Sequence, residues 1–256
     1  MRGELVLSFA TSLGFLLTLT RVAGVFVFVP LPGMRNGMDT ARVFMAVSIT
    51  LALFPLWPQV RDQASIGLLV LWMVSEATLG IGIGLAVAFV VEAVGVAAQV
   101  MGLQAGYSFA SVVDPNTQAD SGILVIFSQL AAGLVLFAIG LDREVLTVFA
   151  TSLITMPAGS APFSHSAAEH VLAAAAVMFT TGIRLALPVI AVLIMVDISL
   201  ALLGRVNAQL QLLTLAFPVK MLLALIVLGW VLAVLPVLMR EDLRTGLSAA
   251  KGLIVR

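Results

Sequence analysis

The chain has 256 residues, of which 61% are hydrophobic and 10% are charged, and its thirteen basic residues balance its thirteen acidic ones. This composition lies far outside that of soluble domains and indicates an integral membrane protein or a subunit of a membrane-embedded assembly. Because basic residues are not in excess, the chain lacks the positive charge that would attract a nucleic acid. With no cysteine in the sequence, disulfides, thiol catalysis and thiolate metal sites are excluded.

The first apolar stretch, residues 5–29, contains one charge, Arg21. As a helix it is long enough to cross a hydrocarbon core of ~30 Å. It is too long for the apolar part of a cleavable signal, so we interpret it as a retained membrane segment. The next apolar stretch, residues 43–54, reaches only ~18 Å as a helix. It predicts a half-span or a helix packed against protein.

Residues 66–91 are again long enough to span a membrane, and Glu76 lies within them. Gly80 and Gly84 are one helical turn apart on one face, which is the small-residue pattern that lets two helix backbones approach closely. No strand precedes these glycines and no phosphate-binding lysine follows, so they do not form a nucleotide-binding motif. We expect them to pack helices together.

The central stretch, residues 99–121, is neither strongly apolar nor charged. Its glycines and the turn signal at 114–116 (DPN) predict a loop or a broken helix. Its small, neutral and aromatic side chains suit a constriction better than a solvated hairpin. Irregular backbone at membrane depth is tolerated only where it is buried in protein or lines a cavity. At that depth, this loop would line a passage.

The second half of the chain is predicted to be helical with unusual lengths. Residues 122–156 fit either one long helix with a charged ring at 142–144 or a span followed by an amphipathic piece, and periodicity does not choose between them. Residues 171–203 would reach ~50 Å as a helix, so this segment must kink, tilt or protrude. Residues 204–218 are predicted to be a connector. The basic connector and the basic tail both look cytoplasmic, although one apparent span separates them.

Five ionisable side chains lie within or at the edge of apolar stretches: Arg21, Glu76, Arg184, Asp197 and Lys220. Each costs at least a few kcal/mol if it faces lipid unpaired, so each is expected to face protein or a water-filled cavity. They could form an ion pathway or salt bridges that fix helix register. The lack of an acidic pair at helical spacing and of a histidine relay favours salt bridges.

No catalytic constellation is present in the sequence. His165 and His170 flank Glu169 with poor geometry for a metal, and there is no Gly-x-Ser-x-Gly elbow, P-loop or His-Glu-x-x-His motif. The sequence therefore predicts a protein that is not an enzyme and has no catalytic, cofactor-binding or metal-binding residues.

Four blocks together resemble the FliR family of flagellar type III export-gate subunits. They are residues 21–33 (RVAGVFVFVPLPG), 106–115 (GYSFASVVDP), 153–159 (LITMPAG) and 205–220 (RVNAQLQLLTLAFPVK). The resemblance covers essentially the whole chain. It implies an all-α fold of membrane-associated helical hairpins with kinked and broken helices, within a helical hetero-oligomeric export gate of the bacterial inner membrane and flagellar basal body.

The resemblance also implies partners and an internal division of the chain. FliP, FliQ and FlhB homologues would be partners, and unfolded flagellar subunits would pass through the gate. Residues 1–165 would be FliP-like, residues 166–239 a FliQ-like hairpin, and residues 240–256 a basic tail. Because gates of this family sit largely above the bilayer plane, the odd segment lengths and the conflicting charge signals would both be explained.

The family's pore plug maps onto residues 106–114. The resemblance implies plug roles for Gly106, Tyr107, Ser108, Phe109, Val112, Val113 and Asp114. Tyr107 and Phe109 would be the bulky occluding side chains, and Arg205 and Lys220 would lie near the cytoplasmic entrance. Two alternatives remain: a secondary transporter, which should show repeated halves that we do not find, and a passive membrane scaffold.

Overall fold

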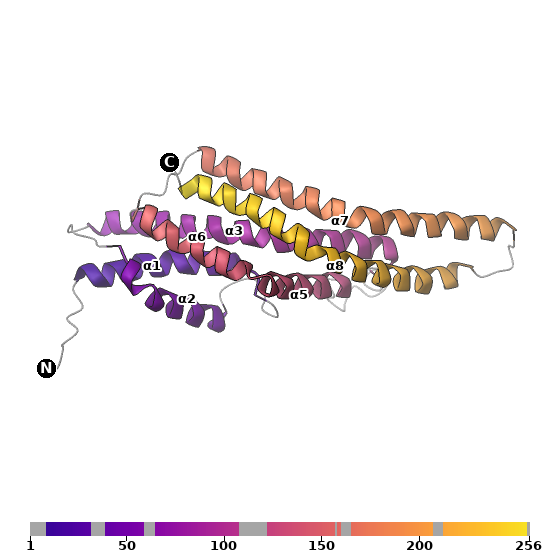
Figure 1. The fold of residues 1–256 in the computed structure, drawn as a ribbon, viewed down its shortest axis with the longest axis horizontal. Coiled ribbons are helices and arrows are strands. Elements are labelled where there is room, and N and C mark those ends of the chain that lie inside the picture. Colours follow the sequence, from indigo (N-terminus) through magenta and orange to yellow (C-terminus); the bar gives the residue numbers. More distant parts are fainter. Residues whose placement is uncertain are drawn as a thin grey trace. The chain divides into compact units, whose positions relative to one another are not determined.

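The computed structural model describes residues 9–31, 39–58, 65–107, 122–156, 158–159, 165–206 and 212–254. In these ranges all regular structure is helical (Figure 1). The helices are α1 (Phe9–Phe28), α2 (Thr40–Ala52), the 3-10 turn η1 (Phe54–Leu56), α3 (Ile66–Ala105), α5 (Ile123–Ala138), α6 (Leu141–Thr155), α7 (His165–Val206) and α8 (Leu212–Ile254).

Four of the described helices are long and apolar enough to cross a membrane. The apolar segments are Ala10–Phe28, Ile66–Ala105, Val171–Arg205 and Ala216–Arg240. The pair α5 and α6 would make a fifth span if the two helices are counted as one broken span. The predicted all-α membrane protein is thereby confirmed for the described part of the chain. α2, with 13 residues, is too short to cross, as the short apolar stretch 43–54 predicted.

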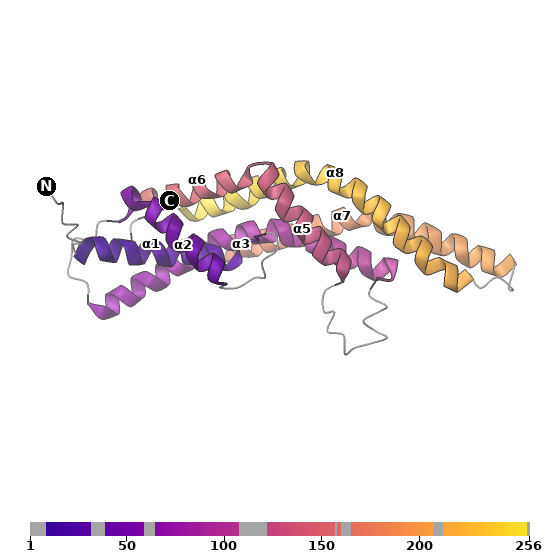
Figure 2. The same ribbon diagram turned by 90° about the horizontal axis from the view of Figure 1, so that it is seen from below.

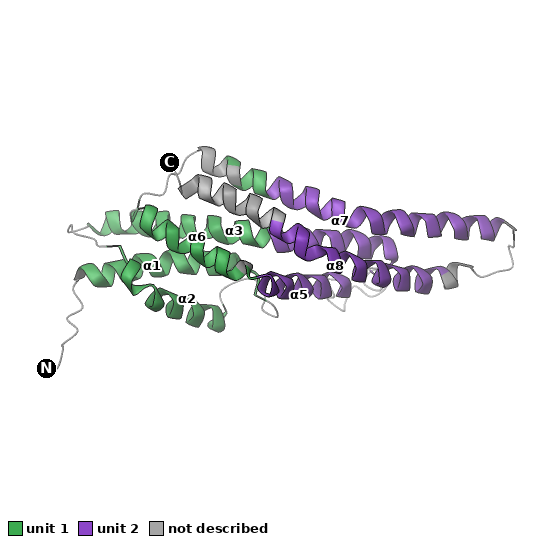
Figure 3. Ribbon diagram, viewed as in Figure 1, with its two compact units in different colours: residues 1–89, 140–174, 243–256 green, residues 90–139, 175–242 purple. Residues whose placement is uncertain are grey.

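The chain divides into two compact units (Figure 3). The first comprises residues 1–89, 140–174 and 243–256, and the second comprises residues 90–139 and 175–242. In the first unit, side chains from α1, α2, α3 and α6 share a core. Its buried members are Val22, Val25, Phe26, Ala46, Ile83, Phe149 and Leu153.

The C-terminal end of α1 is bonded to α2 by Arg42, a residue that the sequence analysis did not single out. Arg42 is fully buried, and its Nη1 donates hydrogen bonds to the carbonyl oxygens of Phe26, Val27 and Val29 at the C-terminal end of α1. These carbonyls have no partner within their own helix, and a cation at a helix C-terminus also complements the helix dipole. Burial lowers the pKa of Arg42, while the Asp39 carboxylate acts to raise it.

In the second unit, α7 and α8 lie side by side in both views (Figures 1 and 2). α7 and α3 are in close contact at Gly182. A Cβ added there would lie 2.8 Å from the carbonyl oxygen of Ala93. Much of the apolar surface of these two helices is nevertheless uncovered. Only 22% of the apolar 18-residue stretch of each helix is buried, compared with 61% of the corresponding stretch of α3. These faces need lipid or neighbouring chains to cover them.

Two boundaries differ from the sequence prediction, and one alternative that it left open, for residues 122–156, is decided. α3 continues through residues 99–105, which we expected to be irregular, and ends only at Gly106. Residues 122–156 form two helices, broken at Gly140, whose φ of 74° places it in the left-handed region. The connector predicted for residues 204–218 is largely helical, because α7 runs to Val206 and α8 begins at Leu212.

Candidate functional site

The candidate site begins where α3 ends. Gly106 has a φ of 91°, and its N–H donates to the carbonyl of Leu103 at 3.2 Å, while the N–H of Tyr107 donates to the carbonyl of Gly102 at 2.9 Å. This pair of bonds is the Schellman arrangement, which satisfies the last carbonyls of a helix and requires a left-handed residue, usually glycine. The chain therefore leaves α3 in a defined direction at Gly106.

The first residues after α3 are attached to α8. The hydroxyl of Tyr107 donates a hydrogen bond to the carbonyl oxygen of Met221 at 2.9 Å. One turn earlier on α8, the ring of Phe217 covers Gly106 so closely that a Cβ there would lie 2.8 Å from Cδ1. Burial raises the pKa of the Tyr107 phenol, so the hydroxyl stays protonated and able to donate. Tyr107 thus attaches the chain to α8 directly after the end of α3.

A polar triad lies in the same unit and links the three helices. Asp197 on α7 accepts from the Lys220 ammonium group on α8 at 2.9 and 3.0 Å and from the Gln104 amide on α3 at 3.2 Å. The Asp197 side chain is 42% exposed, so solvent screening limits the stability that the ion pair contributes. Together with Tyr107, the triad forms the loop root, which we define as Gln104, Gly106, Tyr107, Asp197 and Lys220.

The remaining predicted plug residues, Ser108, Phe109, Val112, Val113 and Asp114, lie outside the described residues. Arg205, predicted at the cytoplasmic entrance, is exposed in the last turn of α7. Lys220, predicted at the same entrance, pairs with Asp197 in the loop root. Sequence reasoning missed Gln104, because an isolated glutamine near a helix end carries no signal of its partner.

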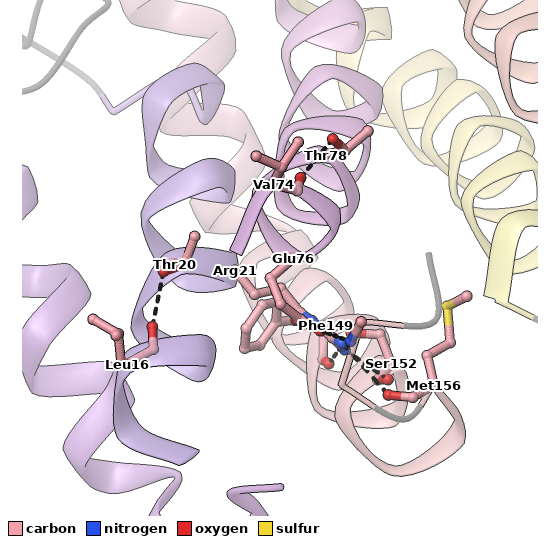
Figure 4. Close-up of polar contacts among 10 residues, drawn as sticks. Leu16, Thr20, Arg21, Val74, Glu76, Thr78, Phe149, Ser152 and Met156 are labelled. Carbon is pink, nitrogen blue, oxygen red and sulfur yellow. Dashed lines mark hydrogen bonds and ion pairs between the residues drawn. The ribbon is translucent and has the colours of Figure 1, made fainter. Parts of the chain in front are cut away.

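A second polar cluster is buried in the first unit (Figure 4). Arg21 on α1 and Glu76 on α3 are each 1% exposed and form an ion pair through Nε of Arg21. The guanidinium also donates to the carbonyl oxygens of Ser152, at 2.8 Å, and Met156, at 3.4 Å. The other carboxylate oxygen of Glu76 accepts from the N–H of Gly159 at 3.1 Å. This cluster ties α1 and α3 to the C-terminal end of α6.

The glycines singled out in the sequence lie beside that cluster. At Gly80, a Cβ would overlap the carbonyl oxygen of Arg21 and lie 3.1 Å from Cα of Gly24, and at Gly84 it would lie 2.6 Å from the carbonyl oxygen of Val25. The α1 and α3 backbones are therefore in direct contact here. Gly24, which the sequence analysis did not identify, is the matching small residue on α1, where a Cβ would lie 2.7 Å from the carbonyl oxygen of Ala77.

Other charged residues are distributed differently. Arg184 is exposed on α7. Asp142 and Glu144 lie in the first turn of α6, where acidic side chains complement the helix dipole. Among the residues that the structure describes, no group of three or more His, Asp or Glu is placed to hold a metal ion.

Tyr107→Phe is expected to loosen the end of α3 by about 0.5–1.5 kcal/mol, because the Met221 carbonyl loses its side-chain donor while the ring remains. In the assembled protein, hydrogen exchange at the amides of Gly106 and Tyr107 should accelerate by about two- to tenfold. Thr78→Val is the control, since the Thr78 hydroxyl bonds only within its own helix. Unchanged exchange in Tyr107→Phe would show that the hydroxyl does not anchor the loop.

Comparison with known proteins identifies relatives over nearly the whole chain. Residues 12–246 match the family model described as bacterial export proteins, family 1. The chain is 28% identical over 204 residues to the flagellar biosynthetic protein FliR of Escherichia coli (strain K12), covering 79% of this chain and 78% of that protein. It is 25% identical over 243 residues to FliR of Bacillus subtilis (strain 168), covering 94% of each. The chain belongs to the bacterial export family that includes FliR.

Proposed function

We propose that this chain closes the conduit of the flagellar type III export gate with the loop between α3 and α5, which is held at its start by the loop root. As a family member, the chain is a multi-pass inner-membrane component of that export gate. The observation that carries the proposal is the attachment of Tyr107 to α8 beside the Gln104, Asp197 and Lys220 triad. A loop fixed at its origin can occupy one defined position.

In this proposal the root and the plug have separate tasks. Gly106 and Tyr107 set the direction of the loop, and Ser108, Phe109, Val112, Val113 and Asp114 form the plug, with Phe109 as the occluding ring. Neutral side chains there would seal the conduit against small ions without selecting among passing sequences. Because the triad is partly exposed, its bonds can exchange with water at low cost when an unfolded substrate displaces the loop.

The proposed partners are FliP, FliQ and FlhB homologues, and the proposed cargo is unfolded flagellar subunits. In this proposal the chain works in transport without catalysis.

We further propose an internal division of the chain. Residues 1–165 are FliP-like, and residues 166–239 form a FliQ-like hairpin that is followed by a basic tail at 240–256. The α7 and α8 hairpin supports this division, although each compact unit takes part of both helices. Arg205 is assigned to the cytoplasmic entrance. Gly80 and Gly84 are assigned to helix packing.

The proposal is tested by replacing residues 108–114 with a Gly/Ser segment of equal length, which keeps the loop root. Cells that express the complete gate should become more permeable to small ions, because the occluding side chains are lost. Replacing residues 116–121 in the same way is the control and should leave permeability unchanged. If the 108–114 variant assembles with its partners and permeability does not rise, the plug assignment is wrong and a passive scaffold fits better.

A further inference from the structure

Arg184 projects from the outer face of α7. The face of α7 that packs against the rest of the second unit includes Gly182, Leu185, Ala186 and Val189, all of which are buried. At ~100° per residue, Arg184 lies about 200° around the helix from Gly182, on the opposite side. Since α7 is in backbone contact with α3 at Gly182, rotating the helix to bring this arginine inward would break that contact.

The surroundings of Arg184 on α7 carry no charge: the uncharged polar residues Thr180 and Thr181 lie one turn before it, and the other outward neighbours are apolar. Neighbouring outward residues include Ile183, 51% exposed, and Leu187, 54% exposed. The nearest charged positions on the helix are Glu169 and Asp197, which are about 22 Å and about 20 Å away along its axis. Asp197 is already paired with Lys220. Within the described ranges, the structure shows no hydrogen bond or ion pair for the Arg184 side chain.

A second polar group at the same place lacks its regular helical hydrogen-bond donor. Pro188, which lies inside α7 and is exposed, has no backbone N–H. The carbonyl of Arg184 therefore lacks the donor that residue i+4 supplies in a regular helix. A cation with no partner in the described chain and a carbonyl without its i+4 donor thus lie within one turn of each other on a largely apolar, exposed face.

We infer that an apolar helix of another gate subunit packs along this face and places a carboxylate against Arg184. The inference rests on the proposed function, because it requires that the chain works in a hetero-oligomer. A carboxylate can accept two parallel hydrogen bonds from a guanidinium. A hydroxyl or amide side chain one turn away on the same helix would supply the donor that the Arg184 carbonyl lacks, as neighbouring helices do at prolines within membranes.

Lipid is the less suitable neighbour for this face. Hydrocarbon satisfies neither the guanidinium nor the carbonyl. A headgroup phosphate suits the guanidinium, but about 20 Å of apolar helix on either side exceeds half of a ~30 Å hydrocarbon core. A phosphate oxygen is also an acceptor, so it leaves the carbonyl unpaired. Side chains of a neighbouring protein helix can provide both kinds of partner at a depth that a headgroup does not reach.

The test begins with a photoreactive residue in place of Leu187, incorporated into the assembled gate. Mass spectrometry should map the cross-link to a peptide of another subunit that is apolar and contains Asp or Glu. A cross-link to lipid alone would overturn the inference while leaving the proposed function intact. If the unmodified chain does not assemble with other export components at all, the proposed function itself fails.

Charge variants then test the carboxylate. Arg184→Met keeps the surface apolar and is expected to lower the yield of assembled gate by at least about tenfold, because the partner's carboxylate is left buried and unpaired. Arg184→Lys should retain much of the yield, and Arg143→Met, at an exposed position on α6, should retain all of it. Arg184→Glu combined with replacement of the cross-linked partner's acidic residue by Arg should restore assembly. Normal assembly in Arg184→Met would overturn the inference.

Discussion

Arg21→Met is expected to lower the free energy of unfolding by about 3–5 kcal/mol, because it leaves a buried carboxylate without its cation. Glu76 is 1% exposed, and the N–H of Gly159 would be the remaining donor shown for it. The carbonyls of Ser152 and Met156 would lose the guanidinium as well. Thermal unfolding of the assembled protein in detergent, followed by circular dichroism at several temperatures, measures the loss.

Two further variants separate the charge from the packing. Replacing both members, Arg21→Met with Glu76→Leu, should recover part of the loss, because no buried charge then lacks a partner. Arg143→Met removes an exposed arginine from the same unit and should change stability by less than about 0.5 kcal/mol. If Arg21→Met unfolds like the unaltered protein, then the pair contributes nothing to the fold.

This cluster shows how far the sequence alone could predict the candidate sites. The cost of placing a charge in an apolar stretch predicted that Arg21 and Glu76 would find partners. Which partners they find was not predictable, because 55 residues separate the two side chains in the chain. The carbonyls of Ser152 and Met156 are backbone acceptors, and every residue carries one, so they leave no signal in the sequence.

The long helices were predictable from apolar length, but several of their ends were not. The glycine at 102 suggested an early end to α3, yet the helix continues because the left-handed position that ends it is Gly106. Pro218 suggested a connector, yet it is the seventh residue of α8, inside the helix and beyond the first turn in which a missing N–H costs little. The leucines before it in α8, Leu212, Leu213 and Leu215, are good helix formers. Their propensity outweighed the apparent polarity of that segment.

The same reasoning explains the partial prediction of the loop root. Family resemblance pointed to Gly106 and Tyr107, and both lie at the end of α3 where a loop must begin. The family resemblance implied that Tyr107 is an occluding ring, and it gave no sign of the bond that its hydroxyl makes to α8. Tertiary attachment of this kind depends on where α8 lies. Neither periodicity nor composition reports that position.

Gly80→Ala is the second large effect that we expect. A methyl group at this position would overlap the carbonyl oxygen of Arg21 and press on Cα of Gly24. Both are backbone atoms of α1, so no side-chain rotation can relieve the overlap, and α1 must move away from α3. Overpacking of this type costs about 1–3 kcal/mol or more, which exceeds the gain of up to about 1 kcal/mol in helix propensity. Denaturation of the assembled protein measures the net loss.

Gly67→Ala is the matched control on the same helix, because nothing lies within 4 Å of a Cβ there. It should leave stability unchanged or raise it by up to about 1 kcal/mol. The clash at Gly80 falls on the residue that carries the buried guanidinium, so separating the helices should also loosen the bond between Arg21 and Glu76. The losses from Gly80→Ala and Arg21→Met should therefore not add when the two are combined. Full additivity would mean that close helix contact and the buried ion pair stabilise the first unit independently.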